Sequence, residues 1–242
     1  MIKFFRKIRY KLMSENKTGK YLKYAIGEIV LVVIGILIAL QVNDWNEVRK
    51  VKVIEQTLLK DIKIELSANL KALKEVILEH EKSLSAAQEL MVLSRKPREL
   101  INLPETTVER LVGTMNKNWT YNPQKGILNS IISSGQLNYI SNKELRYLIA
   151  SIDDITEDTI ESTAEIERDK AALLNPSFKN GFLIENGQML GYSVKGVLQV
   201  PEFWMVTKGL FVDNRIDGIE EENNLKDLIQ KMLNLIDQEI EK

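Results

Sequence analysis

The sequence predicts a mainly α-helical protein, in which a single N-terminal transmembrane helix continues into a long helix that packs in an extracytoplasmic bundle. An apolar stretch lies close to the N-terminus, and the 61 residues from 36 to 96 contain neither glycine nor proline, the usual interruptions of a helix. The predicted organisation is listed in chain order: a basic amphipathic head at 1–20, a transmembrane helix at 21–43, and an extracytoplasmic helical domain at 44–242, with its long helix at 44–96 and the remaining bundle at 97–242.

Charge is unevenly distributed along a chain whose formal net charge is −1. Residues 1–24 hold eight basic side chains and one acidic one, whereas residues 43–242 hold 25 basic and 32 acidic side chains. Nucleic-acid binding depends on basic surface, so we expect this acidic body not to bind nucleic acid. The chain has no cysteine, which excludes disulfides and thiolate metal sites.

The apolar stretch at 25–42 is long enough to cross a bilayer. As a helix it spans about 27 Å, close to the ~30 Å hydrocarbon core. A buried helix of a soluble protein is one alternative, but such a helix seldom follows directly on eight basic residues. A cleavable signal peptide is another, but the leader and the apolar run are long and no small-x-small cleavage site follows. We therefore expect an uncleaved anchor.

The flanks of this stretch predict its direction. Lys and Arg gather on the cytoplasmic side of a span, so the N-terminus is expected inside and the rest of the chain outside. Tyr21 and Tyr24 on one side and Trp45 on the other fit an interfacial aromatic belt. Phe4 and Phe5 lie on the apolar face of a short basic helix, which is predicted to rest on the anionic inner leaflet. Membrane lipid is thus an expected partner.

One carboxylate interrupts the apolar stretch. On a helix, Glu28, Val32, Gly35 and Ala39 form one stripe, in which Gly35 and Ala39 let a second helix approach closely. We predict this stripe as a helix–helix contact in the membrane. For the carboxylate three roles remain open: an interfacial acid, paired with nearby lysines or protonated in place; a polar contact to a partner helix or a second copy; and a proton or ion relay, although no second ionisable residue lies inside the span.

The long helix is predicted to carry an apolar seam. Its members alternate spacings of four and three residues: Leu66, Leu70, Leu73, Ile77, His80, Leu84, Ala87 and Met91. A looser continuation runs upstream through Val51, Ile54, Leu58 and Ile62. Such a seam pairs with a second copy as a coiled coil or with later helices of the same chain. We expect the intramolecular bundle, because the later apolar helices also need covering.

The rest of the chain shows legible helix ends. Capping-box spacing at Thr106 and at Ser141 predicts two helix starts, and Gly135 predicts the end of a helix at about 127–134. Two more helices are expected near 154–174 and 220–240. Residues 178–200 are glycine-rich, and Asn186-Gly187 indicates a small hairpin there, with an irregular excursion as the alternative. Pro201 is predicted to open a short helix that ends at Gly209.

No residue pattern in the chain points to catalysis, a metal or a cofactor. His80, the only histidine, lies on the apolar seam, where we expect a packed or half-exposed ring rather than a ligand. Acidic residues on one face of the helix near 154–174 are interpreted as a solvated surface, because di-metal bundles also supply histidines. The stretch 213–224 resembles a calcium loop but has Arg215 at the third position and Asn224 at the twelfth.

The first 50 residues contain a basic head and the strings "YAIGEI" (24–29), "GILIALQ" (35–41) and "NDWNE" (43–47), and a weaker match occurs in "SSGQLNYISNKELR" (133–146). With these features the chain resembles an uncharacterised family of single-pass membrane proteins found mainly in Bacteroidetes, a domain of unknown function. The resemblance implies a Gram-negative envelope protein, hence an inner (cytoplasmic) membrane anchor and a periplasmic body. It implies no activity.

Two functional hypotheses follow. The first is a non-catalytic membrane-anchored module that binds an unknown envelope protein, as an adaptor or scaffold, with a homo-oligomer as a further option. The second is an envelope hydrolase with an unrecognised active site. The sequence favours the first.

Overall fold

The computed structural model describes Tyr10 and residues 18–240. Its described residues are almost all helical and form two compact units, residues 1–55 and 56–242. The helix that starts the described chain, α2 (Thr18–Ser94), is 77 residues long and contributes to both units. The predicted membrane boundaries at 43 and 44 stay predictions, because compactness and membrane crossing are different properties.

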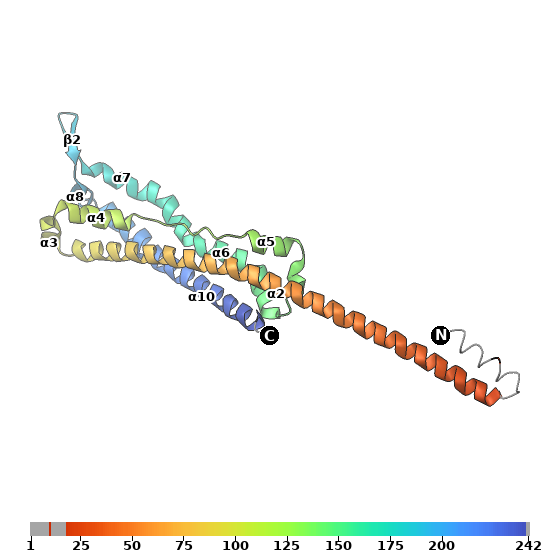
Figure 1. Cartoon of the computed structure of the whole chain (residues 1–242). Coiled ribbons are helices and arrows are strands. Elements are labelled where there is room, and N and C mark those ends of the chain that lie inside the picture. The colour runs from red at the N-terminus through yellow and green to blue at the C-terminus, as the bar shows by residue number, and fades with distance from the viewer. Residues whose placement is uncertain (1–9, 11–17, 241–242) are drawn as a thin grey trace. The chain divides into compact units, whose positions relative to one another are not determined.

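The first unit contains the apolar part of α2 (Figure 1). Of the described residues, α2 contains the one stretch that is long and apolar enough to cross a membrane, and none of that stretch is buried. A helix that is apolar all round and unburied is not a core helix of this chain. It is consistent with a membrane anchor or with a signal sequence.

The second unit is a bundle of long helices: the later part of α2, α6 (Lys143–Asp169) and α10 (Asn214–Ile240) (Figure 1). One core joins these three helices to α5 (Gly126–Ser133), with Leu73 and Ile149 among its fully buried members. The seam of α2 from Leu58 onward therefore packs within the same chain, as predicted, without a second copy, whereas Val51 and Ile54 of its upstream continuation are exposed, at 39% and 37%.

A second core lies at the far end of α2, around Leu90 and Phe203. It is built by short elements. In chain order these are α3 (Pro97–Asn102), α4 (Glu105–Met115), the π-helical segment η2 (Lys170–Leu174), α7 (Asn175–Phe178), η3 (Lys179–Gly181), α8 (Val194–Val197), α9 (Pro201–Val206) and the π-helical segment η4 (Thr207–Asp213).

The hairpin predicted around Asn186-Gly187 is present. Strands β1 (Phe182–Glu185) and β2 (Gln188–Tyr192) pair antiparallel, and both turn residues have positive φ, 49° and 77°. Positive φ at both central positions is the geometry of the two-residue hairpin turn that Asn-Gly favours.

Several helix ends differ from their predictions. The structure gives α4 a start at Glu105, so Thr106 lies inside the helix and is not its cap. Helix α6 starts after Asn142, whose side chain accepts the Leu145 N–H bond, and runs unbroken through the start predicted at 154. Gly135 has φ 72° and ends α5 before the 3-10 turn η1 (Gln136–Tyr139), as predicted.

The short helix that starts at Pro201 does not end at Gly209. It passes into η4 and then into α10, which begins six residues before the predicted 220. A glycine ends a helix only where the chain turns away, and here the buried Leu210, Phe211 and Val212 keep the chain packed on the second core. The stretch that resembled a calcium loop is consequently helical.

Candidate functional site

The stripe predicted for membrane contact lies on the exposed apolar part of α2. Val32, Gly35 and Ala39 are exposed, and Glu28 is half-buried. Continuous helix from Thr18 onward places all four on one face, since their offsets return to nearly the same angle. A side chain added at Gly35 would meet no atom of this chain, so the face is open. The contact itself stays a prediction.

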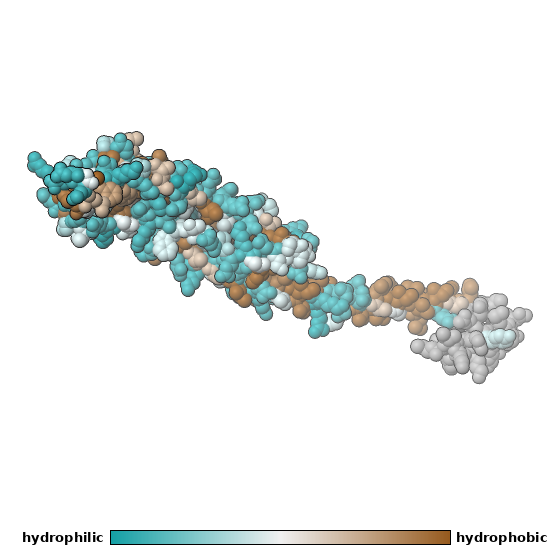
Figure 2. All heavy atoms as spheres, turned by 90° about the horizontal axis from the view of Figure 1, so that it is seen from above, coloured by the Kyte–Doolittle hydropathy of each residue, from teal (hydrophilic) through white to brown (hydrophobic). Residues whose placement is uncertain are grey.

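The aromatic residues predicted for the membrane interface fall into three groups. Trp45 is exposed on α2 at 65%. Tyr21 and Tyr24 belong to the same helix by their backbone. Phe4 and Phe5 lie outside the described residues, as does most of the predicted basic head. In Figure 2 the apolar residues of this helix form a continuous hydrophobic surface. The belt and the head both stay predictions.

The later part of α2 holds an extended segment against itself through four buried polar side chains. We call residues 116–125, between α4 and α5, the strap. The strap and α2 run in opposite directions. At one end of the strap, Ser83 Oγ donates to Met115 O (2.6 Å) and His80 Nε2 accepts from Trp119 N (3.1 Å). At the other end, Asn69 forms two hydrogen bonds with Gln124 (2.7 and 2.8 Å), and Glu65 accepts from Ile127 N (2.7 Å) and Leu128 N (3.0 Å).

These contacts explain why α2 carries polar residues on its buried face. An extended segment that lies on a helix has no ladder partner, and unpaired buried backbone groups cost about 1–3 kcal/mol each. Glu65, Asn69 and His80 are at most 5% exposed and supply the missing partners. Glu65 also places a carboxylate at the N-terminus of α5, where the exposed amide hydrogens favour negative charge.

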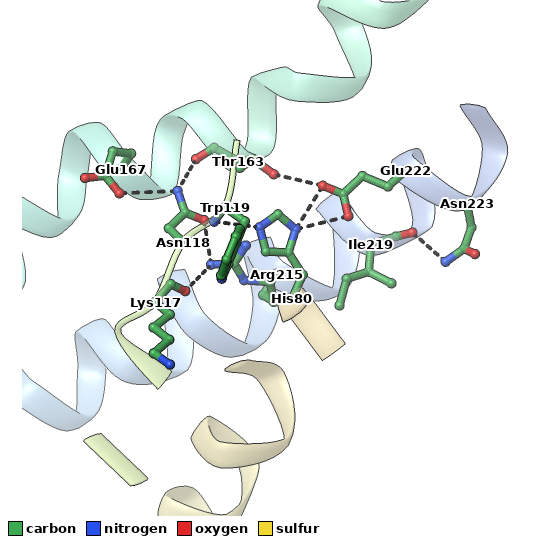
Figure 3. Close-up of polar contacts among 10 residues, drawn as sticks. All are labelled: His80, Lys117, Asn118, Trp119, Thr163, Glu167, Arg215, Ile219, Glu222 and Asn223. Atoms are coloured by element: carbon green, nitrogen blue, oxygen red, sulfur yellow. Dashed lines mark hydrogen bonds and ion pairs between the residues drawn. The ribbon is translucent and has the colours of Figure 1, made fainter. Parts of the chain in front are cut away.

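His80 lies at the centre of a buried polar cluster (Figure 3). Its Nδ1 lies 2.9 Å and 3.1 Å from the two carboxylate oxygens of Glu222. Because Nε2 accepts the Trp119 N–H bond, the ring proton must be on Nδ1, which donates to the carboxylate. The geometry thus fixes a neutral histidine. The sequence predicted the packed ring but not its partners, which are 39 and 142 residues away.

Arg215 balances the charge of Glu222. It is 1% exposed, and its Nη2 donates to Asn118 Oδ1 (2.8 Å) and Lys117 O (3.5 Å), both in the strap (Figure 3). Burial lowers the pKa of Arg215 to about 10, and the nearby carboxylates of Glu222 and Glu167 oppose that shift. The guanidinium stays charged at neutral pH, so the cluster contains a buried cation that interacts electrostatically with Glu222 without a direct ion pair.

The cluster joins every long element of the second unit. Glu222 also accepts from Thr163 Oγ1 (3.4 Å) on α6, and Asn118 donates to Thr163 O (3.1 Å). A cavity of about 330 Å³ opens beside Glu222, with Tyr121 and Thr163 in its lining. Burial raises the pKa of Tyr121 to about 12.

The His80–Glu222 pair resembles a catalytic histidine with its orienting carboxylate, but the ring has no free nitrogen. A general base needs an open ring nitrogen within reach of the proton that it removes. Here Nε2 is bonded to the Trp119 backbone and Nδ1 to Glu222. The arrangement therefore positions the strap and does not present a base to a substrate.

The hairpin exposes a group of large apolar side chains, which we call the hairpin patch. Its members and their exposed fractions are Phe182 45%, Leu183 52%, Ile184 66%, Met189 67%, Leu190 64% and Tyr192 44%. Soluble surfaces seldom gather apolar residues in this way unless they bind something. Residues 178–200 had been predicted only as a hairpin, because a two-residue periodicity does not tell whether either face is covered.

The base of the hairpin is tightly held. Ser193 N donates to Gly181 O (2.8 Å), and Ser193 Oγ donates to Glu105 on α4 (2.8 Å). A methyl group at Gly181 would lie 2.5 Å from the Tyr192 ring, and one at Gly196 would overlap Asn180 O. The patch is thus presented by a fixed base.

Fold and sites together define a mainly helical protein with one membrane-length apolar helix, a strapped bundle and an exposed apolar hairpin. Residues 28–200 match the model of a family of unknown function (DUF6090), and the chain belongs to this family. No curated protein and no solved structure matches the chain. The family match includes the whole strap and the hairpin patch, and it ends before α9. It carries no statement about a membrane or a source organism.

Proposed function

We propose that this protein is a membrane-anchored, non-catalytic helical module of the cell envelope that binds a partner protein. The observation that carries the proposal is the unburied apolar stretch of α2, which follows a basic head. An exposed apolar stretch of 18 residues is unfavourable in water, whereas the hydrocarbon core of a bilayer accommodates it. A signal sequence would show the same exposure, but the long leader and the missing cleavage site favour an anchor.

In this proposal the N-terminus is cytoplasmic and the second unit lies in the periplasm, with the inner membrane as the location. The basic head supports this direction. Two further observations support binding rather than turnover: both nitrogens of the only histidine are occupied by structural bonds, and the hairpin patch is exposed.

Topology reporters test the proposal. The full chain is fused at its C-terminal end to alkaline phosphatase, which is active only outside the cytoplasm, or to a fluorescent protein that matures only inside. We expect phosphatase activity and a chain that sediments with membranes after a carbonate wash. The variant Ile34→Arg/Leu37→Arg should release the chain, since each arginine at a bilayer centre costs about 2.5–3.5 kcal/mol.

The matched control is Leu78→Arg, which places the same charge at an exposed position of α2 outside the span. It should leave the chain in the membrane fraction. A fluorescent fusion without phosphatase activity, or a wild-type chain that stays in the supernatant, would contradict the proposal.

A further inference from the structure

The hairpin patch is too large to be left in water and has a strand edge beside it. Within the described residues the sheet consists of β1 and β2 alone, so each strand has one edge without a neighbouring strand. Such edges pair readily with further strands, and a two-stranded sheet by itself is of marginal stability. The patch and the edge therefore point to a partner that supplies more β-structure.

The register identifies which edge is suited to pairing. Leu183 pairs with Gly191 and Ile184 with Met189, so Leu190 is an extra residue on β2. A bulge of this kind kinks its own strand and spoils that edge for regular pairing. Strand β1 carries no extra residue. Its free edge is the regular one.

We propose that β1 pairs antiparallel with β1 of a second copy of this chain, to form a four-stranded sheet across a two-fold axis at Leu183. The proposal rests on the proposed membrane anchor, because anchoring in one bilayer raises the effective concentration of the copies. Two-fold symmetry closes the assembly after two chains and leaves only the bulged β2 edges outside.

Charge favours this antiparallel arrangement. Lys179 lies just before β1 and Glu185 ends it, and both are exposed. Antiparallel pairing about Leu183 sets Glu185 of each copy opposite Gly181 of the other, and Lys179 lies two residues further, about 4–7 Å along the chain and within a Debye length. Parallel pairing would set Glu185 beside Glu185 and Lys179 beside Lys179. Opposite charges of the two copies therefore face each other only when the strands pair antiparallel.

The available area agrees with a weak dimer that forms on a surface. At roughly 150–250 Å² for a large side chain, the exposed fractions leave about 600 Å² of apolar area per copy. Edge pairing covers only the part of this area that lies along β1, so two copies bury less than about 1,200 Å², the lower limit of specific interfaces, and the shared bilayer must make up the difference in apparent affinity. The hairpin also projects crosswise to the long helices of its unit (Figure 1). A two-fold axis parallel to those helices therefore makes the two hairpins antiparallel, while the helices of both copies still point the same way relative to the membrane.

Single cysteines in this cysteine-free chain test the pairing. The full chain is placed in vesicles of phosphatidylethanolamine and phosphatidylglycerol and treated with a short bismaleimide. Leu183→Cys, next to the two-fold axis, should cross-link to a dimer. Gln188→Cys, at a tip that faces away from the other tip, should give little product. In the Leu183→Cys background, Ile184→Lys should lower the dimer by about tenfold or more, whereas Leu78→Lys should not.

A charge exchange tests the direction. Glu185→Lys and Lys179→Glu should each lower the dimer about threefold, and the double exchange should restore it. A dimer that persists in Ile184→Lys, or equal cross-linking at 183 and 188, overturns the proposal. A Leu183→Cys chain that stays monomeric also overturns the proposal. If lipid then shields the introduced thiol from aqueous maleimide, the hairpin patch inserts into the bilayer. If the thiol stays reactive, the patch binds another protein.

Flotation of the same vesicles separates this inference from the anchor. A chain that floats but does not cross-link overturns the pairing alone, whereas a chain that does not float overturns the anchor.

Discussion

The two parts of helix α2 differ in where their apolar residues lie. In the first, residues 25–42, apolar side chains cover every face and none is buried. In the second, residues 56–94, one face is buried against the bundle and the other carries charge. Both parts are helical, although the first is richer in β-branched residues and glycine, which favour helix less. The pattern around the helix, not the tendency to form one, decides what each part requires as its surroundings.

A second difference concerns polar groups. The described apolar stretch contains one carboxylate, Glu28, whereas the buried face of the second part contains Glu65, Asn69, His80 and Ser83. The latter are tolerated because each one bonds to a backbone group of the strap or its ends. Buried polar residues in this bundle thus mark places where backbone groups outside helices and sheets need a hydrogen-bond partner.

The largest expected effect removes the buried carboxylate of the second part. Glu222→Ala should lower the free energy of unfolding by about 3–5 kcal/mol, since it leaves His80 Nδ1 and Thr163 Oγ1 without their acceptor and the buried Arg215 charge without the nearby carboxylate. Denaturant titration of the full chain in detergent, followed by circular dichroism, measures this loss. Glu220→Ala, at an exposed position of the same helix, should change it by less than about 0.5 kcal/mol. Equal effects would contradict the assigned role of the cluster.

The same substitution in the two parts of α2 sharpens the comparison directly. Leu73 is fully buried, so Leu73→Ala should cost the bundle about 2–5 kcal/mol. Leu37 is 56% exposed, and Leu37→Ala should leave the unfolding of the bundle unchanged. In a Trp45→Phe background, which removes the tryptophan of the first unit, fluorescence of Trp119 and Trp204 during denaturation follows the second unit alone. A loss for Leu37→Ala similar to that for Leu73→Ala would refute the distinction.

The strap gives a smaller and local effect. Glu65→Ala should cost about 1–3 kcal/mol, because the buried amides of Ile127 and Leu128 lose their acceptor. Hydrogen exchange should accelerate first at those two amides and at the start of α5. Glu75→Ala, an exposed change on the same helix, serves as the control. Unchanged protection at 127 and 128 would show that the carboxylate does not hold the strap.

Alkaline titration tests the burial of Tyr121. Its folded pKa of about 12 lies above the ordinary value of 10.0. The unfolded chain therefore releases this proton first, and the stability that the buried phenol contributes is complete below pH 10 and is lost as pH rises towards 12. Phenolate absorbance should show one tyrosine that ionises about two pH units late. Its disappearance in Tyr121→Phe assigns it, and a normal titration of all tyrosines would contradict the burial.

The smallest effect is expected in the apolar part. Glu28→Gln should leave membrane insertion intact, because the residue lies near the edge of the proposed span, and should weaken any oligomer that uses the stripe with Gly35 and Ala39. Cross-linking in membranes compares it with Gln41→Asn, a conservative change near the other edge. An unchanged cross-linking pattern would count against the stripe as a contact.

The sequence predictions succeeded where the structure depends on residues that are close together in the sequence. The seam from Leu66 to Met91, the Asn186-Gly187 turn and the stop at Gly135 were predictable, because each depends on residues a few positions apart. The family, of unknown function, was recognised from the first 50 residues, and the match covers 28–200. The cap at Asn142 instead of Ser141 shows how neighbouring residues compete for one local role.

What remained hidden was long-range. Nothing local to His80 names Trp119 or Glu222, and nothing local to Glu65 names the start of α5. The continuation of α9 through Gly209 into α10 depends on the second core, which holds Phe211. Those contacts form only when distant segments meet, so no window of sequence contains both partners.

By itself the sequence determined that the chain is helical, that its apolar residues surround one part of a helix and line one face of the next, and where the tight turns lie. These follow from periodicity and local backbone preference. Only the tertiary structure decided which polar side chains secure the strap, which proton His80 carries and which apolar side chains of the hairpin stay uncovered. Burial and hydrogen bonding at those sites are properties of segments brought together from far apart along the chain.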